Sequence, residues 1–289
     1  MYTKKIGVGI FTFNRPHYLK RLLQSMRTQV DPGDYDVHFF CDGAINMHNR
    51  QKRAEQKDID ATIAVAKAEV PVENFRAHVQ PKNRGIAVQQ YEAYNYLAKG
   101  YDYAIWLDDD VELGPYWFRT ARLMADELEK HQNWVSASPM FTKCCAKGTE
   151  FTSLSKYKVG NFPWIGFIMD MRMWPELRAV YQDYYDLVKD RDYRSRPHEK
   201  IRALYKKHGY EKPHSSQDAG KEMSIRRLGW RRIKMLVNRG RYIGEHGEHG
   251  RPDNYRAQGW QNHWKIDWAG DADTADLERI LPDDPPWHV

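Results

Sequence analysis

The sequence predicts an α/β protein in which helices flank a mostly parallel central sheet. Over the first 140 residues, short runs rich in Val, Ile, Phe, Tyr and Trp alternate with segments of helical apolar spacing. The chain of 289 residues is long enough for one large α/β domain or two small ones. Hydrophobic residues make up 41% of it, and no stretch reaches the roughly 18 consecutive apolar residues of a membrane-spanning helix. Fibrous and integral membrane classes are therefore excluded.

Four strands are predicted in the first half, each dense enough in β-branched and aromatic residues to be buried on both faces. They span residues 6–13, 37–41, 75–79 and 103–107. Helices are predicted between and after them, over 16–29, 56–69, 86–99 and 115–131, because apolar residues recur there at helical spacing. These elements make up a first region, 1–140.

The alternation fades after residue 134. Strands are expected at 134–138, 166–171 and 232–237, and helices at 174–188, 197–208 and 216–228. A glycine-rich loop able to wrap a ligand is expected from Gly240 to Gly250. We therefore expect a second region of the same domain, 141–266, followed by an acidic, peripheral tail, 267–289.

Charge is distributed unevenly along the chain. The net charge is +6, but residues 189–241 hold 17 Lys and Arg against 6 Asp and Glu, whereas residues 267–284 hold 7 acidic residues against 1 basic residue. The basic block is either a solvated helical face or a surface for an anionic partner such as a diphosphate, a lipid headgroup or a nucleic acid. Three cysteines, two of them adjacent, argue against a disulfide framework. With no secretory signal recognised, a cytoplasmic location, or one peripheral to the membrane, is expected.

Three adjacent carboxylates, Asp108, Asp109 and Asp110, end the predicted strand 103–107. Like charges at a buried strand end require a cation, and the carboxyl ends of strands are where ligands bind in open α/β sheets. Strand alternation would place Asp108 and Asp110 on one face and Asp109 on the other. Carboxylate oxygens suit Mn²⁺ or Mg²⁺, which can bridge to a diphosphate. The alternative is an acidic turn in solvent.

Polar residues also follow the other three early strands. Asn14 and Arg15 follow the first strand, and Asp42 follows the second. The turn 82–85 after the third strand offers backbone N–H groups and cations for phosphate or ribose contact. We therefore expect four polar strand ends to line one rim of the sheet.

Two later segments complete the candidate chemistry. Residues 245–250 hold His246 and His249, one of which would complete the octahedron of an aspartate-bound Mn²⁺; the alternative is a surface loop without metal. Residues 215–219 open the last helix, where Asp218 either favours the helix dipole beside a serine cap or serves as a general base.

Taken together, these motifs resemble the GT-A-fold (Rossmann-like) nucleotide-sugar glycosyltransferases of the broad family 2 pattern. Their order resembles that of the animal N-acetylglucosaminyltransferases that start complex N-glycans: Arg15, Asp42, an acidic triplet with an Asp-X-Asp arrangement, a Phe-Pro-X-X-Gly turn at 162–166, Asp218 and a glycine-rich loop with His249. This family carries a His in the helix after the third strand, where this chain has Gln89.

The resemblance implies a role for each matching residue. Asp42 would read uracil, Arg15 would contact the nucleotide, Asp108 and Asp109 would hold ribose and sugar hydroxyls, and Asp218 would be the catalytic base. The nucleotide-sugar site would comprise Thr12, Asn14, Arg15, Asp42, Asn83, Arg84, Gly85, Gln89, Asp108, Asp109, Trp164 and Gly166. The metal would be bound by Asp110, His249 and His246.

The expected function is metal-dependent, inverting transfer of a sugar from a UDP-sugar or similar donor to an acceptor hydroxyl, with a retaining course left open. Region 1–140 would bind the donor, and region 141–266 would form the acceptor side. A glycan, a lipid-linked glycan or DNA carrying modified bases would be the acceptor, facing the 189–241 block. Two alternatives stand: a sugar-phosphate nucleotidyltransferase, although the first loop lacks the glycines typical of that class, and a non-catalytic nucleotide- or glycan-binding protein.

Overall fold

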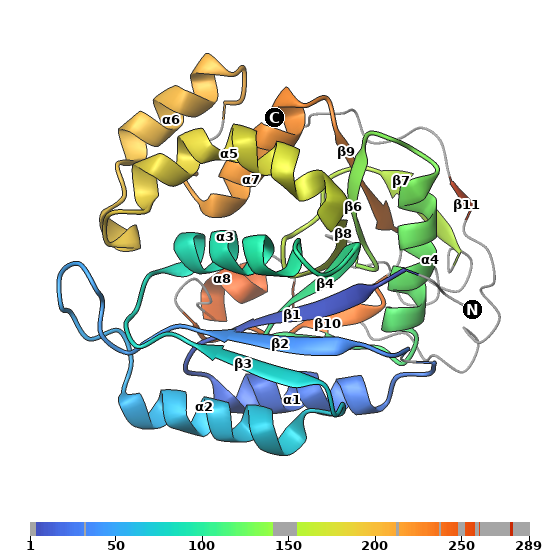
Figure 1. Cartoon of the computed structure of the whole chain (residues 1–289), viewed down its shortest axis with the longest axis horizontal. Helices are drawn as coiled ribbons and strands as arrows, with labels where there is room; N and C mark the ends of the chain where they lie inside the picture. The colour runs from blue at the N-terminus through green and yellow to red at the C-terminus, as the bar shows by residue number, and fades with distance from the viewer. Residues whose placement is uncertain are drawn as a thin grey trace.

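A nine-stranded sheet forms the centre of the described chain. The computed structural model describes residues 4–31, 33–140, 155–211, 214–236, 238–247, 252–257, 260 and 278–279. The strand order within these residues is β11-β7-β9-β6-β8-β4-β1-β2-β3. Helices cover both faces of the sheet (Figure 1). The predicted α/β class with a mostly parallel central sheet is confirmed.

The first half of the chain is a run of parallel strands connected by helices. β1 pairs in parallel with β2 and β4, and β2 pairs in parallel with β3. The strands are β1 (Ile6–Thr12), β2 (Asp36–Cys41), β3 (Phe75–Val79) and β4 (Tyr103–Asp108). The helices are α1 (Pro16–Arg27), α2 (Gln56–Glu69), α3 (Ile86–Leu97) and α4 (Trp117–Glu129). The carboxyl ends of these four strands therefore meet at one edge of the sheet.

The second half makes the sheet mixed. β8 (Gly166–Asp170) lies antiparallel between β4 and β6 (Trp134–Ser138), and β9 (Arg231–Met235) continues the sheet in parallel with β6. The helices of this half are α5 (Trp174–Val188), α6 (His198–Lys207) and α7 (Gln217–Arg227). All of these elements were predicted to within two residues at each end.

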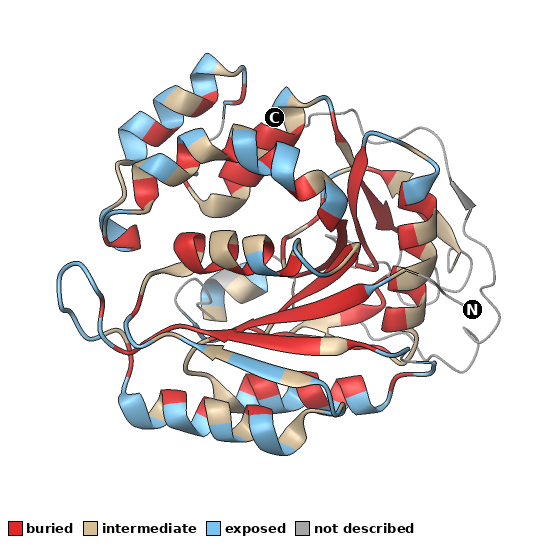
Figure 2. Ribbon diagram, viewed as in Figure 1, coloured by how far each residue is buried: buried red, intermediate tan, exposed pale blue. Residues whose placement is uncertain are grey.

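Two hydrophobic cores hold the layers together. α1 and α4 pack on one face of the sheet, where Leu19, Leu22 and Leu23 of α1 are fully buried, as their helical spacing predicts. On the other face lie α3, α5 and α7 (Figure 1), whose buried residues form one core with Trp106 of β4, which Tyr94 of α3 contacts at 4.3 Å between ring centroids. The central strands are buried along nearly their whole length (Figure 2).

The structure corrects the prediction for β3. This strand forms the edge of the sheet, and Arg76, Ala77 and Val79 are exposed. Its apolar content led to the expectation of burial on both faces, but an edge strand is flanked on one side only.

Several short elements were not predicted. Within the expected glycine-rich loop, β10 (Gly240–Tyr242) pairs antiparallel with β5 (Val111–Leu113). The others are β7 (Lys156–Val159), α8 (Pro252–Ala257) and, in the predicted tail, β11 (Glu278–Arg279). Strands of two to four residues are too short to show a periodicity.

We expect Gly9→Ala to destabilise the fold. A Cβ at Gly9 would overlap the ring of Trp106, which is 1% exposed and stacks on Phe11 at 5.4 Å. Overpacking of this kind lowers the free energy of unfolding by about 1–3 kcal/mol. Urea denaturation measures it. Gly100→Ala is the matched control, because a Cβ there meets nothing within 4 Å; equal stability of the two variants would contradict the prediction.

Candidate functional site

Arg15 joins the ends of β1 and β4 through two buried carboxylates. Its Nη1 donates to Asp110 Oδ2 at 2.7 Å, and its Nη2 donates to Asp109 Oδ1. Thr12 Oγ1 donates to Asp109 Oδ2 at 3.0 Å. Asp109 and Asp110 are 1% and 4% exposed, so both carboxylates depend on these partners in place of water.

The structure corrects the predicted alternation of the acidic triplet. β4 ends at Asp108, and Asp109 and Asp110 form a turn, so that both meet the same guanidinium rather than opposite faces. Asp108 instead interacts electrostatically with Asp218 as well as with its two neighbours. The turn therefore brings Asp109 and Asp110 to Arg15, whereas Asp108, at the end of β4, interacts with the charge of Asp218 on α7.

Burial and charge perturb the protonation of this cluster. Burial, followed by the charges of Asp110 and Asp218, raises the pKa of Asp108 well above its ordinary range. Burial also raises the pKa of Asp109 to about 6, although Arg15 opposes the rise. Burial alone would lower the pKa of Arg15, but the two carboxylates outweigh it and raise that pKa. The cluster is thus a set of closely spaced, interacting charges at one rim of the sheet.

The segment after β10 closes over Asp110. The backbone N–H of Ile243 donates to the carbonyl of Asp110 at 2.8 Å. Gly244 follows, where a Cβ would overlap the Asp110 carboxylate, so only glycine allows this close approach. The N–H of His246 donates to Tyr18 Oη at 3.0 Å, and its carbonyl accepts from Arg15 Nη1 at 3.4 Å. The structure thus brings His246 to this rim.

The described residues do not by themselves fit a complete metal site. His249 lies outside them, and within them no group of three His, Cys, Asp or Glu side chains could hold a metal ion. Asp110 carries the hard oxygens that Mn²⁺ or Mg²⁺ prefers, but its Oδ2 is engaged by Arg15.

Asp42 ties the end of β2 to the turn after β3. Its Oδ1 accepts from the N–H groups of Gly43 at 3.0 Å and Arg84 at 2.8 Å, and its Oδ2 accepts from the N–H of Gly85 at 2.8 Å. Gly85 has φ of 84°, a left-handed conformation that favours glycine. The backbone N–H groups expected to face a phosphate or ribose therefore bind Asp42, which corrects that part of the prediction.

Other residues predicted for the nucleotide-sugar site lie either at the rim or within the sheet. Asn83 pairs through its backbone with Ile45 and Met47, which anchors the turn. Gly166 lies in β8 and pairs with Leu107 of β4, which is the residue that precedes the acidic triplet. Asn14 is half-buried between β1 and α1.

A second charged cluster surrounds Asp218 on α7. Ser216 caps this helix by accepting from the N–H of Ala219 at 3.2 Å, as the capping interpretation predicts. Asp218 Oδ1 lies 3.0 Å from Lys221 Nζ. The Lys221 side chain is 1% exposed, whereas that of Asp218 is 40% exposed, so the carboxylate reaches solvent while its partner does not.

Lys221 is itself held by α3 and an aromatic ring. Its Nζ donates to Gln90 Oε1 at 2.9 Å and to Tyr94 Oη at 3.2 Å. The same Nζ lies 4.1 Å from the centroid of the Trp164 ring. Sequence reasoning missed Lys221, although its position three residues after Asp218 on one helix face was the available signal.

Trp164 also contributes to a buried ion pair. Its Nε1 donates to Glu222 Oε1 at 3.0 Å, and Glu222 pairs with Arg232 of β9. The Arg232 guanidinium lies between the rings of Phe162 and Trp164, at 3.6 and 3.8 Å from their centroids. Burial lowers the pKa of Arg232 to about 9. Sequence reasoning missed Glu222 and Arg232, because only the fold brings α7 and β9 to the 162–166 turn.

Asp108 is the point at which the two clusters meet, since its charge interacts both with Asp109 and Asp110 and with Asp218. Carboxylates of different environment therefore share one rim, with Arg15 on one side and Lys221 on the other. Such an arrangement can hold hydroxyl groups, meet a phosphate with a guanidinium and offer a solvent-reaching carboxylate as a base.

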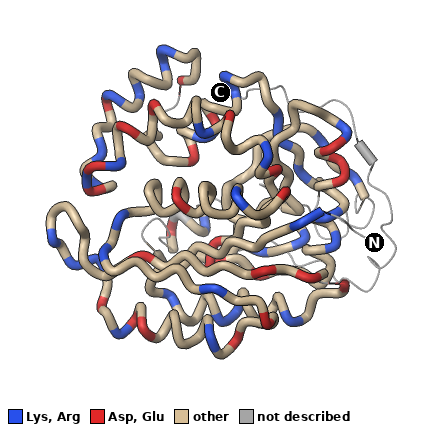
Figure 3. The backbone as a smooth tube through the Cα atoms, in the orientation of Figure 1, with Lys and Arg blue, Asp and Glu red and all other residues tan. Residues whose placement is uncertain are grey.

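The basic block 189–241 is not a single exposed face. Lys221, Arg232 and Arg239 are buried within it. Exposed cations remain on α6, at Lys200, Arg202 and Lys206–Lys207 (Figure 3). No helix in the described part of the chain has the length and apolar character needed to cross a membrane.

No family model matches the sequence, and no curated protein matches it significantly. Among solved structures, the chain is similar to S. aureus TarS (TM-score 0.39, 14% identity, 60% of this chain and 29% of that one). It is also similar to residues 1–349 of S. aureus TarS (TM-score 0.43, 12% identity, 80% and 58%). A third similar structure is the bifunctional glycosyltransferase WbbM in its apo form (TM-score 0.34, 12% identity, 63% and 35%). The chain spans less than two thirds of the length of each.

We expect Arg15→Met to lower the free energy of unfolding by about 3–5 kcal/mol, because it leaves two buried carboxylates without a cation. Arg15→Lys should lower the free energy of unfolding by less, since lysine keeps the charge but cannot form the bidentate contact with both carboxylates. Arg21→Met is the control: Arg21 pairs with Glu112 at 2.7 Å, but its side chain is 44% exposed, and such pairs contribute at most about 1 kcal/mol.

The decrease in the free energy of unfolding caused by Arg15→Met should also depend on pH. Without Arg15 the pKa of Asp109 rises above its wild-type value of about 6. As the pH falls, the folded variant therefore binds a proton at a higher pH than the folded wild type does. The difference in the free energy of unfolding between wild type and variant thus decreases as the pH falls from about 9 toward about 6. Chemical denaturation across this range measures the effect; a deficit independent of pH would contradict this origin.

Proposed function

We propose that the protein is a nucleotide-sugar-dependent glycosyltransferase of the GT-A type. The observation that carries the proposal is the convergence of Asp108, Asp109, Asp110 and Asp218 at the carboxyl ends of β1 and β4. Open α/β sheets bind ligands outside these strand ends. A sugar nucleotide brings the groups that suit such a rim: hydroxyls for carboxylates and a diphosphate for a guanidinium.

In this proposal the donor lies along the rim from β2 to β4. The nucleoside lies near Asp42, Arg15 faces the diphosphate, and Asp108 accepts hydrogen bonds from ribose and sugar hydroxyls. Asp109 is fully buried and bonds to Arg15 and Thr12, so in this proposal it positions Arg15 rather than binding a hydroxyl as the resemblance implied. Arg15 is suited to its role because its guanidinium lies at the end of β1 and is 25% exposed at the side chain. Uridine as the nucleoside is the expectation drawn from the resemblance.

A divalent cation at Asp110, with His246 and His249 as further ligands, is a separate part of the proposal. Bound there, Mn²⁺ or Mg²⁺ would supply charge stabilisation to the departing diphosphate. The hard carboxylate oxygens of Asp110 and the approach of residue 246 to the same rim support it.

Asp218 is the proposed general base. The acceptor hydroxyl attacks the anomeric carbon from the face opposite the diphosphate and passes its proton to the Asp218 carboxylate. The bond from the anomeric carbon to the diphosphate oxygen breaks as the new glycosidic bond forms, which inverts the configuration. The exposure of Asp218, the ion pair that orients it and its electrostatic interaction with Asp108 support this assignment.

The acceptor is proposed to approach from the side of α6 and α7. The exposed cations of α6 favour an acceptor with anionic groups, such as a phosphate-linked lipid glycan. DNA with modified bases has the same charge, and steep loss of binding with added salt would distinguish a polynucleotide.

Asp218→Asn should lower sugar transfer by about 10²-fold or more while donor binding remains measurable, because the amide cannot accept the proton. A thermal-shift screen of nucleotide sugars identifies the donor, and release of nucleoside diphosphate with candidate acceptors measures transfer. Asp183→Asn, an exposed residue of α5 that pairs with Arg227, is the matched control. Equal loss of donor binding and transfer would make Asp218 structural.

Asp110→Asn should abolish the dependence of turnover on Mn²⁺ or Mg²⁺ while the fold is kept, because an amide is a weaker ligand for a hard cation. Titration of each metal into wild type and variant measures the dependence, and circular dichroism reports the fold. Unchanged metal-dependent activity in the variant would remove the metal from the proposal.

A further inference from the structure

A pocket lies between the edge of the sheet and α3. No residue of the acidic clusters lines it, although its Gln80 and Gln89 end adjoins the turn that bonds to Asp42. It is bounded by β2, β3 and α3 and has a volume of about 160 Å³. An apolar cavity of about 150 Å³ is large enough for one benzene ring. The pocket is therefore large enough for a single six-membered ring.

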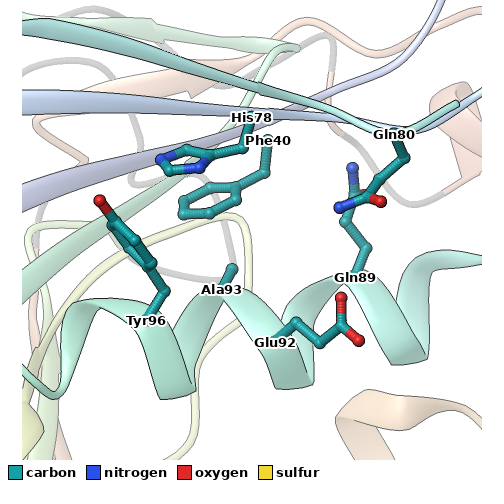
Figure 4. A pocket seen from close by; sticks show the side chains of 7 residues that line it. All are labelled: Phe40, His78, Gln80, Gln89, Glu92, Ala93 and Tyr96. Atoms are coloured by element: carbon teal, nitrogen blue, oxygen red, sulfur yellow. The ribbon is translucent and has the colours of Figure 1, made fainter.

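Three aromatic side chains form one end of this pocket (Figure 4). Phe40 of β2 and His78 of β3 stack with centroids 4.7 Å apart and an interplanar angle of 10°. Tyr96 of α3 meets His78 edge-on at 4.5 Å. Flat walls of this kind favour a planar ligand, which gains offset or edge contacts with the rings.

The other end of the pocket offers a hydrogen-bond donor. Gln89 of α3 is 7% exposed, and its Nε2 has no hydrogen-bond partner among the described residues. Its amide nitrogen points from α3 toward Gln80, across the pocket (Figure 4). A buried donor without a partner carries a desolvation penalty, which a ligand with an acceptor would relieve.

A chain of hydrogen bonds fixes one neutral tautomer each of His38 and His78, the second of which lines the pocket. Tyr101 Oη donates to Asp36 Oδ2 at 2.6 Å, so the Tyr101 oxygen accepts from His38 Nε2 at 2.8 Å. His38 then accepts at Nδ1 from His78 Nε2, 3.2 Å away. Burial lowers the pKa of His38 to about 4 and also lowers that of His78. Both rings are neutral near pH 7, and Nδ1 of His78 is left as an acceptor.

The one carboxylate of the pocket is already paired. Glu92 Oε2 accepts from Arg84 Nη1 at 2.6 Å. The pocket therefore presents neutral rings with an acceptor at His78 Nδ1, the amide of Gln80, a paired carboxylate and the buried Gln89 donor. Because none of these carries an unpaired charge, the pocket favours an uncharged ligand over a cation or an anion.

From this geometry we propose that the pocket is a second ligand site, distinct from the acidic rim, which binds an uncharged single planar ring bearing a carbonyl acceptor. Gln89 Nε2 donates to that acceptor, and Phe40, His78 and Tyr96 hold the ring. The proposal does not rest on the glycosyltransferase assignment, because the residues of the acidic clusters do not line the pocket. It assigns Gln89, which the resemblance placed in the nucleotide-sugar site, to this second site instead.

The test uses the full chain and the probe 2-pyridone, a single ring with one carbonyl, titrated by protein-observed NMR. Wild type should bind it, and Gln89→Met, which keeps the side-chain volume but removes the donor, should bind it at least about tenfold more weakly. Gln56→Met is the matched control, because Gln56 of α2 is exposed and bonds to Asp60 far from the pocket. Benzene, which lacks an acceptor, should bind wild type and Gln89→Met alike.

Two further measurements address the location of the ring. Ala93→Leu should abolish binding by filling the pocket, and if this variant does not fold, the Gln89→Met and Gln56→Met comparison still decides. Binding should persist in Asp110→Asn and in the presence of excess UDP. No binding to wild type, equal binding to Gln89→Met, or displacement by UDP would each overturn the proposal. Failure of every nucleotide sugar to bind would remove the proposed function and leave this site standing.

Discussion

The contact on which the rim depends is the pairing of one guanidinium with two buried carboxylates. Asp109 and Asp110 are almost completely removed from water, and Arg15 reaches both. Carboxylates at adjacent positions cannot both be ionised in such a place without a cation. Arg15 stands between the end of β1 and the start of α1, so the same contact fixes where α1 begins relative to the end of β4. The segment after β10 then closes against Asp110 and Arg15.

This arrangement constrains any ligand of the rim. A diphosphate that takes hydrogen bonds from Arg15 competes with Asp109 and Asp110 for the same donors. The binding of an anion and the protonation of the carboxylates are therefore linked: whatever draws Arg15 away makes the two carboxylates more basic, or more available to another cation. The electrostatics of the rim thus oppose an isolated anion and favour one that arrives together with positive charge.

The sequence predicted the fold well because burial leaves a periodic signal, whereas contacts between distant segments leave none. The apolar runs of β1, β2 and β4 and the leucines of α1 were readable because each packs against a covered face. The predicted burial of β3 on both faces was wrong because its apolar content does not reveal that it lies at an edge of the sheet. The predicted alternation of the acidic triplet was wrong because β4 ends at Asp108, before Asp109. The electrostatic interaction of Asp218 with Asp108 and the Glu222–Arg232 pair join segments distant in the chain and left no trace in either segment alone.

β2 explains why a polar pocket exists beside a hydrophobic core. Its alternating residues face different layers: Val37 and Phe39 pack in the core with α1, whereas Phe40 belongs to the core on the α3 side and His38 stacks parallel to it at 6.4 Å. An apolar residue at position 38 would extend the core to the edge of the sheet. A histidine there must instead be hydrogen-bonded, and Asp36, Tyr101 and His78 provide the chain of hydrogen bonds that satisfies it.

Buried polar chains that connect an exposed edge to a cavity destabilise a fold unless every member is paired. The chain is complete up to His78, and the unpaired donor of Gln89 lies in the same cavity. Gln89 Nε2 is thus a buried donor without a partner at a point that a ligand in the pocket can reach.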